Sequence, residues 1–146
     1  MHRVSLTGAQ PGRPERMAFA PSPDDPSFYK MAVDEEHIYA VDLDGLLRAP
    51  LTAGARFQDF WRGPGPEVKG LAVTPSHIYW STETMGATDC AAATIYRKAK
   101  APDAPAVVMV NYPGSCPSWE LLLHGDYLYT VITSVQGGAQ IVRLRR

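Results

Sequence analysis

A short phrase of residues occurs three times in this chain and constrains its fold more than any other feature. Met-Ala-Val at 31–33 precedes His-Ile-Tyr at 37–39. A second copy at 71–79 has Leu-Ala-Val and again His-Ile-Tyr, and a looser third copy at 121–129 begins Leu-Leu-Leu and ends Tyr-Leu-Tyr. The tyrosines that end the copies lie 40 and then 50 residues apart. This period indicates a fold built from repeated supersecondary units.

The composition is that of an ordinary globular domain. The chain has 146 residues, of which 45% are hydrophobic and 20% charged, enough for one domain with a real core. A net charge of −1 gives no reason to expect a nucleic-acid or anionic-membrane partner. The longest apolar run, at 106–110, is too short to span a bilayer, and no signal-peptide pattern is visible at the start.

Turn-forming residues indicate that the chain is all-β. Its 13 prolines and 12 glycines cluster between short apolar runs, where turns need a preset or a positive φ. These residues interrupt every stretch of ten or more residues that could show helical periodicity. Asp-Gly at 44–45 predicts a tight hairpin between two of the apolar runs.

Aligning the repeats predicts a unit of four strands. Each unit consists of runs rich in β-branched and aromatic residues, bounded by Gly, Pro, Asp and Ser. First strands are expected at 28–34, 68–74 and 118–124, second strands at 37–42, 77–82 and 126–133, third strands at 45–51, 94–100 and 139–146, and fourth strands at 55–61 and 106–112. Four antiparallel strands at a period of 40–45 residues are typical of a β-propeller blade.

The strand count predicts a single partial propeller domain over 1–146. Residues 1–20 contain two strand-like runs, at 2–6 and 16–20, which we expect to be the last strands of a preceding blade. Three further blades are expected at 28–61, 68–112 and 118–146, and the last of them lacks its outer strand. Closed propellers have about four to eight blades, so about three blades indicate a partial ring. Either the chain is a fragment of a larger ring, or it closes the ring by associating with another copy.

The middle repeat resembles a known family. His-Ile-Tyr-Trp-Ser-Thr at 77–82, with Gly-Leu-Ala-Val before it and Ile-Tyr-Arg-Lys at 95–98 after it, is similar to the repeat of the low-density-lipoprotein-receptor type (Tyr-Trp-Thr-Asp) propellers. It is most similar to their bacterial relatives, which are often secreted or lipid-anchored proteins of unknown function. Ser81 and Thr82 stand where the family has Thr and Asp. In that family the motif packs one blade against the next, so the resemblance implies a fold and no activity.

The two cysteines, Cys90 and Cys116, are candidates for a disulfide. By the strand count both lie in loops on the same face of the propeller, 26 residues apart. A disulfide there would indicate an oxidising, extracytoplasmic compartment. The alternative is two independent thiols. Neither a Cys-x-x-Cys motif nor a histidine at ligand spacing accompanies them, so we expect no catalytic cysteine and no metal site.

The same face carries the candidate ligand-binding residues. Trp119 follows the Cys116 loop at the start of an inner strand near the channel mouth, where an aromatic ring offers contact area to a sugar or another ligand. Glu83 and Asp89 are expected in loops of this face, together with Asp24 and Asp25. The alternative for these carboxylates is that they are solvated loop charges. The alternative for Trp119 is a structural role, which we expect for Trp61 and Trp80.

No motif in the sequence carries a recognisable catalytic chemistry. Neither a nucleophile elbow nor a pair of catalytic carboxylates is visible, and His37 and His77 occupy equivalent positions a whole repeat apart. We therefore expect a binding or scaffold module without cofactor or metal, which presents loops to a protein or a small ligand. Two alternatives remain open. The chain is part of a propeller lyase or hydrolase with its site over the channel, or it is a truncated product without a function of its own.

Overall fold

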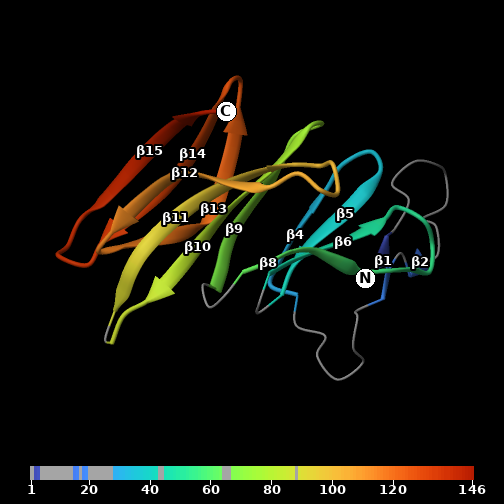
Figure 1. The fold of residues 1–146 in the computed structure, drawn as a ribbon, viewed down its shortest axis with the longest axis horizontal. Coiled ribbons are helices and arrows are strands. Elements are labelled where there is room, and N and C mark those ends of the chain that lie inside the picture. The colour runs from blue at the N-terminus through green and yellow to red at the C-terminus, as the bar shows by residue number, and fades with distance from the viewer. Residues whose placement is uncertain are drawn as a thin grey trace, which may run out of the picture.

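The structure is a computed structural model of the chain (Figure 1). It describes residues 28–42, 45–63, 67–87 and 89–146, and the backbone of three two-residue strands before them. These contain strands and no helix, which confirms the all-β class. The central hairpin residues Leu43 and Asp44, and the candidate residues Asp24 and Asp25, lie outside the described residues.

Three antiparallel sheets make up the body of the molecule, each with its strands in chain order. Sheet 1 consists of β4 (Lys30–Val33), β5 (His37–Val41), β6 (Gly45–Pro50) and β8 (Gln58–Arg62). Sheet 2 consists of β9 (Glu67–Val73), β10 (His77–Met85), β11 (Cys90–Ala99) and β12 (Ala106–Pro113). Sheet 3 consists of β13 (Ser115–His124), β14 (Tyr127–Ser134) and β15 (Ala139–Arg145).

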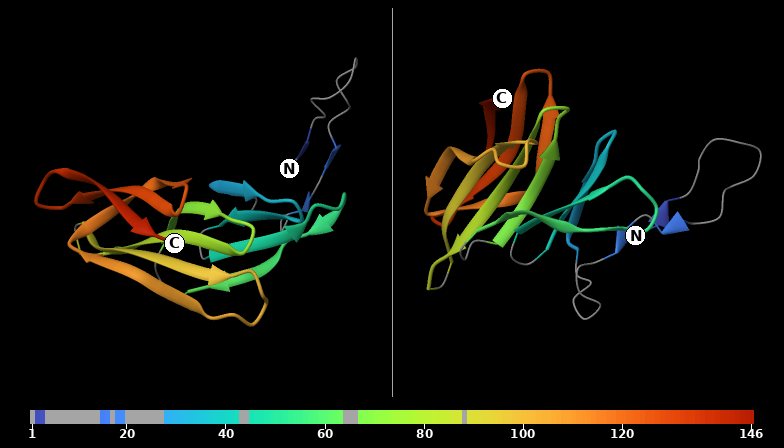
Figure 2. Two further views of the ribbon diagram at one scale, coloured as in Figure 1. Left: turned by 90° about the horizontal axis from the view of Figure 1, so that it is seen from above. Right: turned by 45° about the vertical axis from the view of Figure 1, so that its right-hand side comes forward.

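The sheets lie side by side with their first strands adjacent. β9 packs against β4 of the sheet before it and against β13 of the sheet after it (Figure 1). Figure 2 shows the three sheets as successive layers in two further views. The described sheets form an open row and do not close on themselves. Among the described residues there is also no helix of the length and apolarity needed to cross a membrane.

The repeated phrase forms the first hairpin of each sheet, and short polar side chains fix its turn. Oδ1 of Asp34 accepts a hydrogen bond of 2.7 Å from the backbone N–H of His37. In the second copy, Oγ1 of Thr74 accepts one of 2.9 Å from the N–H of His77. The third copy has Gly125 at a φ of +52°, a left-handed conformation that favours glycine. Three different residues thus produce the same reversal.

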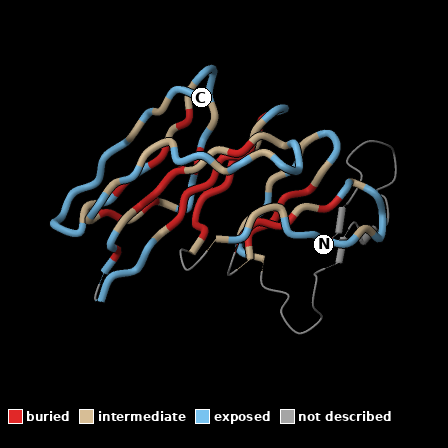
Figure 3. The backbone as a smooth tube through the Cα atoms, in the orientation of Figure 1, coloured by how far each residue is buried: buried red, intermediate tan, exposed pale blue. Residues whose placement is uncertain are grey.

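Two core clusters lie between neighbouring sheets, where much of the chain is buried (Figure 3). Between sheets 1 and 2, the indole of Trp80 is stacked on Tyr96 at a centroid distance of 5.3 Å and contacts Trp61 at 5.1 Å. The other buried residues of this core are Tyr39, Val41, Leu46, Val68, Leu71 and Ile78. The buried residues between sheets 2 and 3 are Ala72, Tyr79, Ile95, Leu121 and Leu128. The tyrosines of the first two repeats are therefore packing residues.

The fourth strand of sheet 1 differs from the expected strand at 55–61. It is split at Phe57, and only β8 pairs with β6. The side chain of Phe57 is buried against Ile38 and Leu47, and its ring lies 4.9 Å from that of Phe28. Because Phe57 points into this cluster, the backbone leaves the edge of the sheet before it.

The short N-terminal strands differ from expectation in one respect. β1 (His2–Arg3) and β2 (Glu15–Arg16) pair antiparallel, in keeping with strand-like runs at 2–6 and 16–20. β3 (Ala18–Phe19) instead runs parallel to β7 (Ala55–Arg56). The single strand expected at 16–20 is therefore divided between two partners. That residues 1–20 belong to a preceding blade stays a prediction.

Candidate functional site

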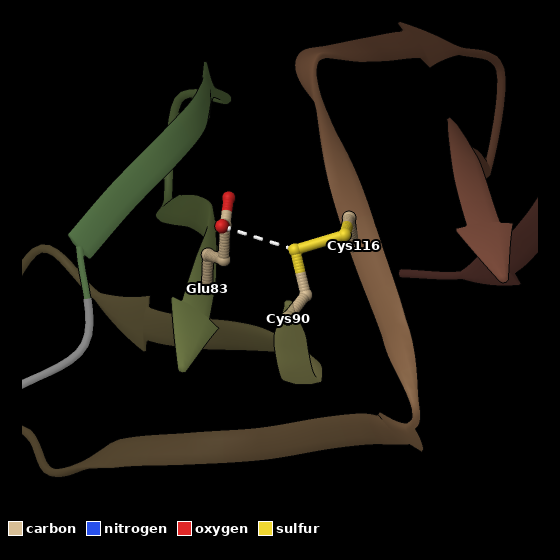
Figure 4. A group of neighbouring side chains, drawn as sticks. All are labelled: Glu83, Cys90 and Cys116. Carbon is tan, nitrogen blue, oxygen red and sulfur yellow. Dashed lines mark hydrogen bonds between the residues drawn. A yellow bond between two sulfur atoms is a disulfide. The ribbon is translucent and has the colours of Figure 1, made fainter. Parts of the chain in front are cut away.

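A disulfide joins sheet 2 to sheet 3 at one end of the row. Cys90 is the first residue of β11 and Cys116 is the second residue of β13, with 5.3 Å between their Cα atoms (Figure 4). The disulfide expected from the sequence is therefore present. It ties the start of a third strand to the start of the first strand of the next sheet.

The residues around the disulfide lie in strands rather than in the expected loops. Glu83 belongs to β10 and is paired with Ala93, and the β10–β11 hairpin continues to Met85 and Cys90. Within this extension Ala92 pairs with Thr84, and Ala91 lies at a register shift before the last pair. Among the described residues between β10 and β11, Gly86, Ala87 and Asp89 lie outside the strands, and Asp89 is exposed.

Trp119 occupies an interruption in the pairing of β13 with β14, between residues 117 and 121. Oγ of Ser118 accepts a hydrogen bond of 3.1 Å from the N–H of Glu120, and Oγ1 of Thr130 donates one of 2.9 Å to the Glu120 carbonyl. The side chains thus replace the missing ladder bonds of this bulge. Trp119 is 48% exposed at this bulge, whereas Leu121, directly after the bulge, is buried.

A buried lysine brings two of the predicted residues together. Nζ of Lys69, on β9, lies 4.4 Å from the centroid of the Trp119 ring. The same Nζ is 2.9 Å from a carboxylate oxygen of Glu67 and 3.4 Å from one of Glu83. Trp119 and Glu83 therefore share one ammonium group, whereas Asp89 takes no part in these contacts. Sequence reasoning missed Lys69, although a lysine within the apolar run of 67–73 was the available signal.

A second lysine holds the backbone of Trp119. Nζ of Lys30, on β4 of sheet 1, donates to the carbonyl oxygen of Trp119 and lies 2.6 Å from Oε1 of Glu120. The first strands of all three sheets thus contribute to one group: Lys30 from β4, Lys69 from β9 and Trp119 from β13. We call these three residues with Glu83 and Glu120 the Trp119 cluster. Lys30 thus holds the backbone of Trp119, and Lys69 lies against its ring.

The disulfide leaves no free thiol in the Trp119 cluster. Oε1 of Glu83 lies 3.0 Å from Sγ of Cys90, as the dashed line in Figure 4 shows. A disulfide sulfur carries no proton, so this approach is a close contact and not a hydrogen bond. The ligand atoms of Glu83, Cys90 and Cys116 lie within 4.8 Å of one another, a spacing that a metal ion could bridge. Because metals bind thiolates, these two bonded sulfurs do not form a metal site in the oxidised protein.

No protein-family model matches this sequence, and no curated protein is detectably similar to it. Evidence for its function therefore comes from the geometry of the Trp119 cluster and its surroundings.

A cavity lies at the first-hairpin turns of sheets 1 and 2. It has a volume of about 560 Å³ and is lined by Val33, Asp34, Glu35, Glu36, Val73, Thr74, Pro75 and Lys100. Nζ of Lys100, at the end of β11, forms an ion pair with Asp34 in the turn of sheet 1. Both carboxylate oxygens of Asp34 are thus engaged, one by Lys100 and one by backbone N–H groups. We assign Asp34 a structural role in joining the two sheets.

The surroundings of Asp34 shift its ionisation. Burial acts to raise the pKa of this carboxyl group, but the hydrogen bond from Lys100, those from the N–H groups of Glu36 and His37, and the charge of Lys100 together lower it from 3.8 to about 2. A carboxyl group whose pKa is lower in the folded state stabilises the fold above its unfolded pKa. That stability is lost as the pH falls from about 4 towards 2.

We expect Asp34→Asn to lower the free energy of unfolding at neutral pH by about 2 kcal/mol, because the shift of Asp34 represents that much interaction. The difference from the wild type should shrink as the pH falls from 4 to 2, where wild-type Asp34 becomes protonated as well. Urea unfolding across this pH range measures both values. Asp59→Asn is the control, because it removes an exposed carboxylate that is paired with Arg62. This substitution should change the free energy of unfolding little at any pH. A pH-independent loss for Asp34→Asn would contradict the assignment.

Proposed function

We propose that this chain is a non-catalytic binding module, built from propeller blades and active outside the cytoplasm, that takes its ligand at the Trp119 cluster. The observation that carries the proposal is the exposure of Trp119. Trp119 is half exposed, yet Lys30 from sheet 1 binds its backbone carbonyl and Lys69 from sheet 2 lies against its ring. An aromatic face fixed in this way binds a ligand without a large loss of conformational freedom.

The propeller interpretation is supported by the arrangement of the sheets. Each sheet begins with the same repeated phrase, and the three first strands are neighbours, as the inner strands of propeller blades are. The Tyr-Trp pair at 79–80 packs in the cores between sheets, in line with the structural role of the Tyr-Trp-Thr-Asp motif. We propose that sheets 1, 2 and 3 are blades of this type.

The extracytoplasmic location is supported by the disulfide. Disulfides persist in oxidising compartments and are rare in the reducing cytosol. The Cys90–Cys116 bond joins two sheets near the proposed binding surface, where it limits their relative movement. We propose a periplasmic, secreted or surface-exposed protein on this basis.

The electrostatics of the Trp119 cluster favour a neutral ligand with an apolar face and several hydroxyl groups, such as a sugar ring. The ammonium of Lys69 already occupies the ring's electron-rich face, so a second cation gains less from it. The C–H face of a pyranose can cover the remaining ring surface. The carboxylate of Glu120, which is exposed beside Trp119, can accept hydrogen bonds from hydroxyl groups.

The same contacts speak against catalysis at this site. Glu67 and Glu83 are both engaged by Lys69, and Glu120 is engaged by Lys30. Among the described residues of the cluster, no carboxylate is hydrogen-bonded to a nucleophilic hydroxyl group or thiol. A positioned ring flanked by neutralised charges is suited to holding a ligand.

Titration calorimetry with three oligosaccharides tests this proposal: maltohexaose, cellohexaose and chitohexaose. We expect at least one to bind, and Trp119→Ala to weaken that binding at least about fivefold, because a stacked ring contributes on the order of 1 kcal/mol or more. Trp119→Phe keeps an aromatic face and should retain most of the affinity. The proposal fails if none of the three binds, or if Trp119→Ala binds as the wild type does.

A further inference from the structure

Each sheet has two packing faces, which recur in a fixed order. We call the face towards the preceding sheet proximal and the face towards the following sheet distal. In sheet 2 the proximal face carries Leu71 and Trp80, which are buried against sheet 1. Its distal face carries Tyr79 and Ile95, which are buried against sheet 3. The fold therefore packs a distal face onto a proximal face twice.

The distal face is uncovered in sheet 3. Leu46, Ile95 and Ile141 occupy equivalent positions, because each lies opposite the residue two places after the repeated tyrosine. Leu46 and Ile95 are 0% exposed, whereas Ile141 is 80% exposed. Leu122 and Val131, on the same face as Ile141, are also exposed. Figure 3 shows the last strand pale blue over much of its length.

The proximal face is uncovered along the first strand of sheet 1. Met31, Leu71 and Leu121 are equivalent residues of the repeated phrase, and they are 51%, 5% and 5% exposed. Tyr29 and Val33 alternate with Met31 on the same face and are exposed too. The rest of the proximal face of sheet 1 is buried, because it packs in a separate cluster that includes Phe57. The free part of the proximal face is therefore the row of Tyr29, Met31 and Val33.

We propose that a second copy of this chain covers both faces. In the dimer, the distal face of sheet 3 in one protomer packs onto the Tyr29–Met31–Val33 row of its partner, and the reverse contact forms at the other end. The repeat indicates that the partner is a second copy. Within the chain a distal face packs on a proximal face twice, and the two uncovered surfaces are one distal face and part of one proximal face. A two-fold axis relates the two contacts, as in most homodimers. Six sheets then form one assembly, within the range of closed propellers.

Neither surface of this dimer is part of the proposed ligand site. Ile141, Leu122 and Met31 take part in none of the contacts that define the Trp119 cluster, and Lys30 alternates with Met31 and so faces the other side of β4. Dimerisation and ligand binding can therefore be tested separately. The exposed apolar residues also explain why association is favourable, because burying apolar surface contributes about 25 cal/mol per Å² before the cost of association.

Sedimentation equilibrium measures the association. Over chain concentrations of about 1 to 100 μM, a range in which protein interfaces of ordinary size associate, we expect a mass approaching twice the 16.0 kDa of the chain. Met31→Lys and Ile141→Glu should each weaken the dimer at least about tenfold, because each places a charge in an apolar contact. Val108→Lys is the matched control, since Val108 is similarly exposed but lies on β12, away from both faces. Circular dichroism verifies that each variant is folded.

A mixing experiment establishes which faces meet. A protomer with Met31→Lys and a protomer with Ile141→Glu keep one native contact between them and place opposite charges at the other. We expect the mixture to dimerise at concentrations at which either variant alone is monomeric. A monomeric wild type over the whole range overturns the proposal and points to further sheets in a longer chain as the occupant. Equal weakening by Val108→Lys, or no effect of Met31→Lys, also overturns it.

Discussion

Replacing Trp80 with alanine is expected to lower the free energy of unfolding by about 3–5 kcal/mol, the cost of removing a large aromatic side chain from a packed core. Trp80 is fully buried between sheets 1 and 2, where its indole contacts both Trp61 and Tyr96. The sheets have little room to close around the resulting cavity, because strand pairing fixes the backbone on both sides. A domain of ordinary stability, about 5–15 kcal/mol, would lose a large share of it.

Urea unfolding followed by far-ultraviolet circular dichroism measures this loss. Trp119→Ala provides a matched control, because it makes the same chemical change at a half-exposed position and should cost about 1 kcal/mol or less. Similar losses at Trp80 and Trp119 would show that the core between sheets 1 and 2 does not have the packing described above.

Removing the disulfide is expected to have the second large effect. Cys90 and Cys116 close a loop over a sequence separation of 26 residues. In the chain-entropy model, a loop of this length restricts the unfolded chain by about 3–4 kcal/mol at 25 °C. The variant with both Cys90→Ala and Cys116→Ala should therefore unfold at a clearly lower urea concentration than the wild type.

A reductant separates the effect of the bond from that of the two side chains. The wild type treated with a phosphine reductant should shift towards the double variant, whereas the double variant should not respond. If the wild type unfolds at the same urea concentration with and without reductant, and mass spectrometry shows that the bond was broken, the disulfide does not contribute to stability as described.

The repeated phrase predicted the sheets well because its signal is local. Alternating residues point to opposite faces of a sheet, so that Ile78 lies in the core with sheet 1 and Tyr79 in the core with sheet 3. Asp or Thr at the turn supplies the hydrogen bonds of the turn itself. First and second strands therefore begin and end within a few residues of their expected bounds. The disulfide could also be predicted from the sequence, because the strand count placed both cysteines on the same face of the propeller.

Other features depend on contacts that the sequence does not display. The extension of β10 and β11 runs through Ala92 and Ala93, which carry little β propensity and pair with Thr84 and Glu83 because the hairpin continues. The bulge at Trp119 depends on Ser118 and Thr130, which are distant in sequence and meet across two strands. Lys69 was missed because a charge in a strand is ordinarily solvated, and because two of its partners, Glu83 and Trp119, come from other strands. The resemblance to Tyr-Trp-Thr-Asp propellers stays a prediction.

The most direct test of the binding proposal is a heteronuclear correlation spectrum of the tryptophan indole N–H groups, recorded during titration with the oligosaccharide that binds best. The chain has three tryptophans, and they differ in their surroundings: Trp80 is fully buried, Trp61 packs against it, and only Trp119 is half exposed. Trp119→Phe assigns the signal of Trp119 by its loss. We expect that signal to move with increasing sugar while those of Trp61 and Trp80 stay in place. An unchanged Trp119 signal, or equal shifts of all three, would contradict a ligand site at the Trp119 cluster.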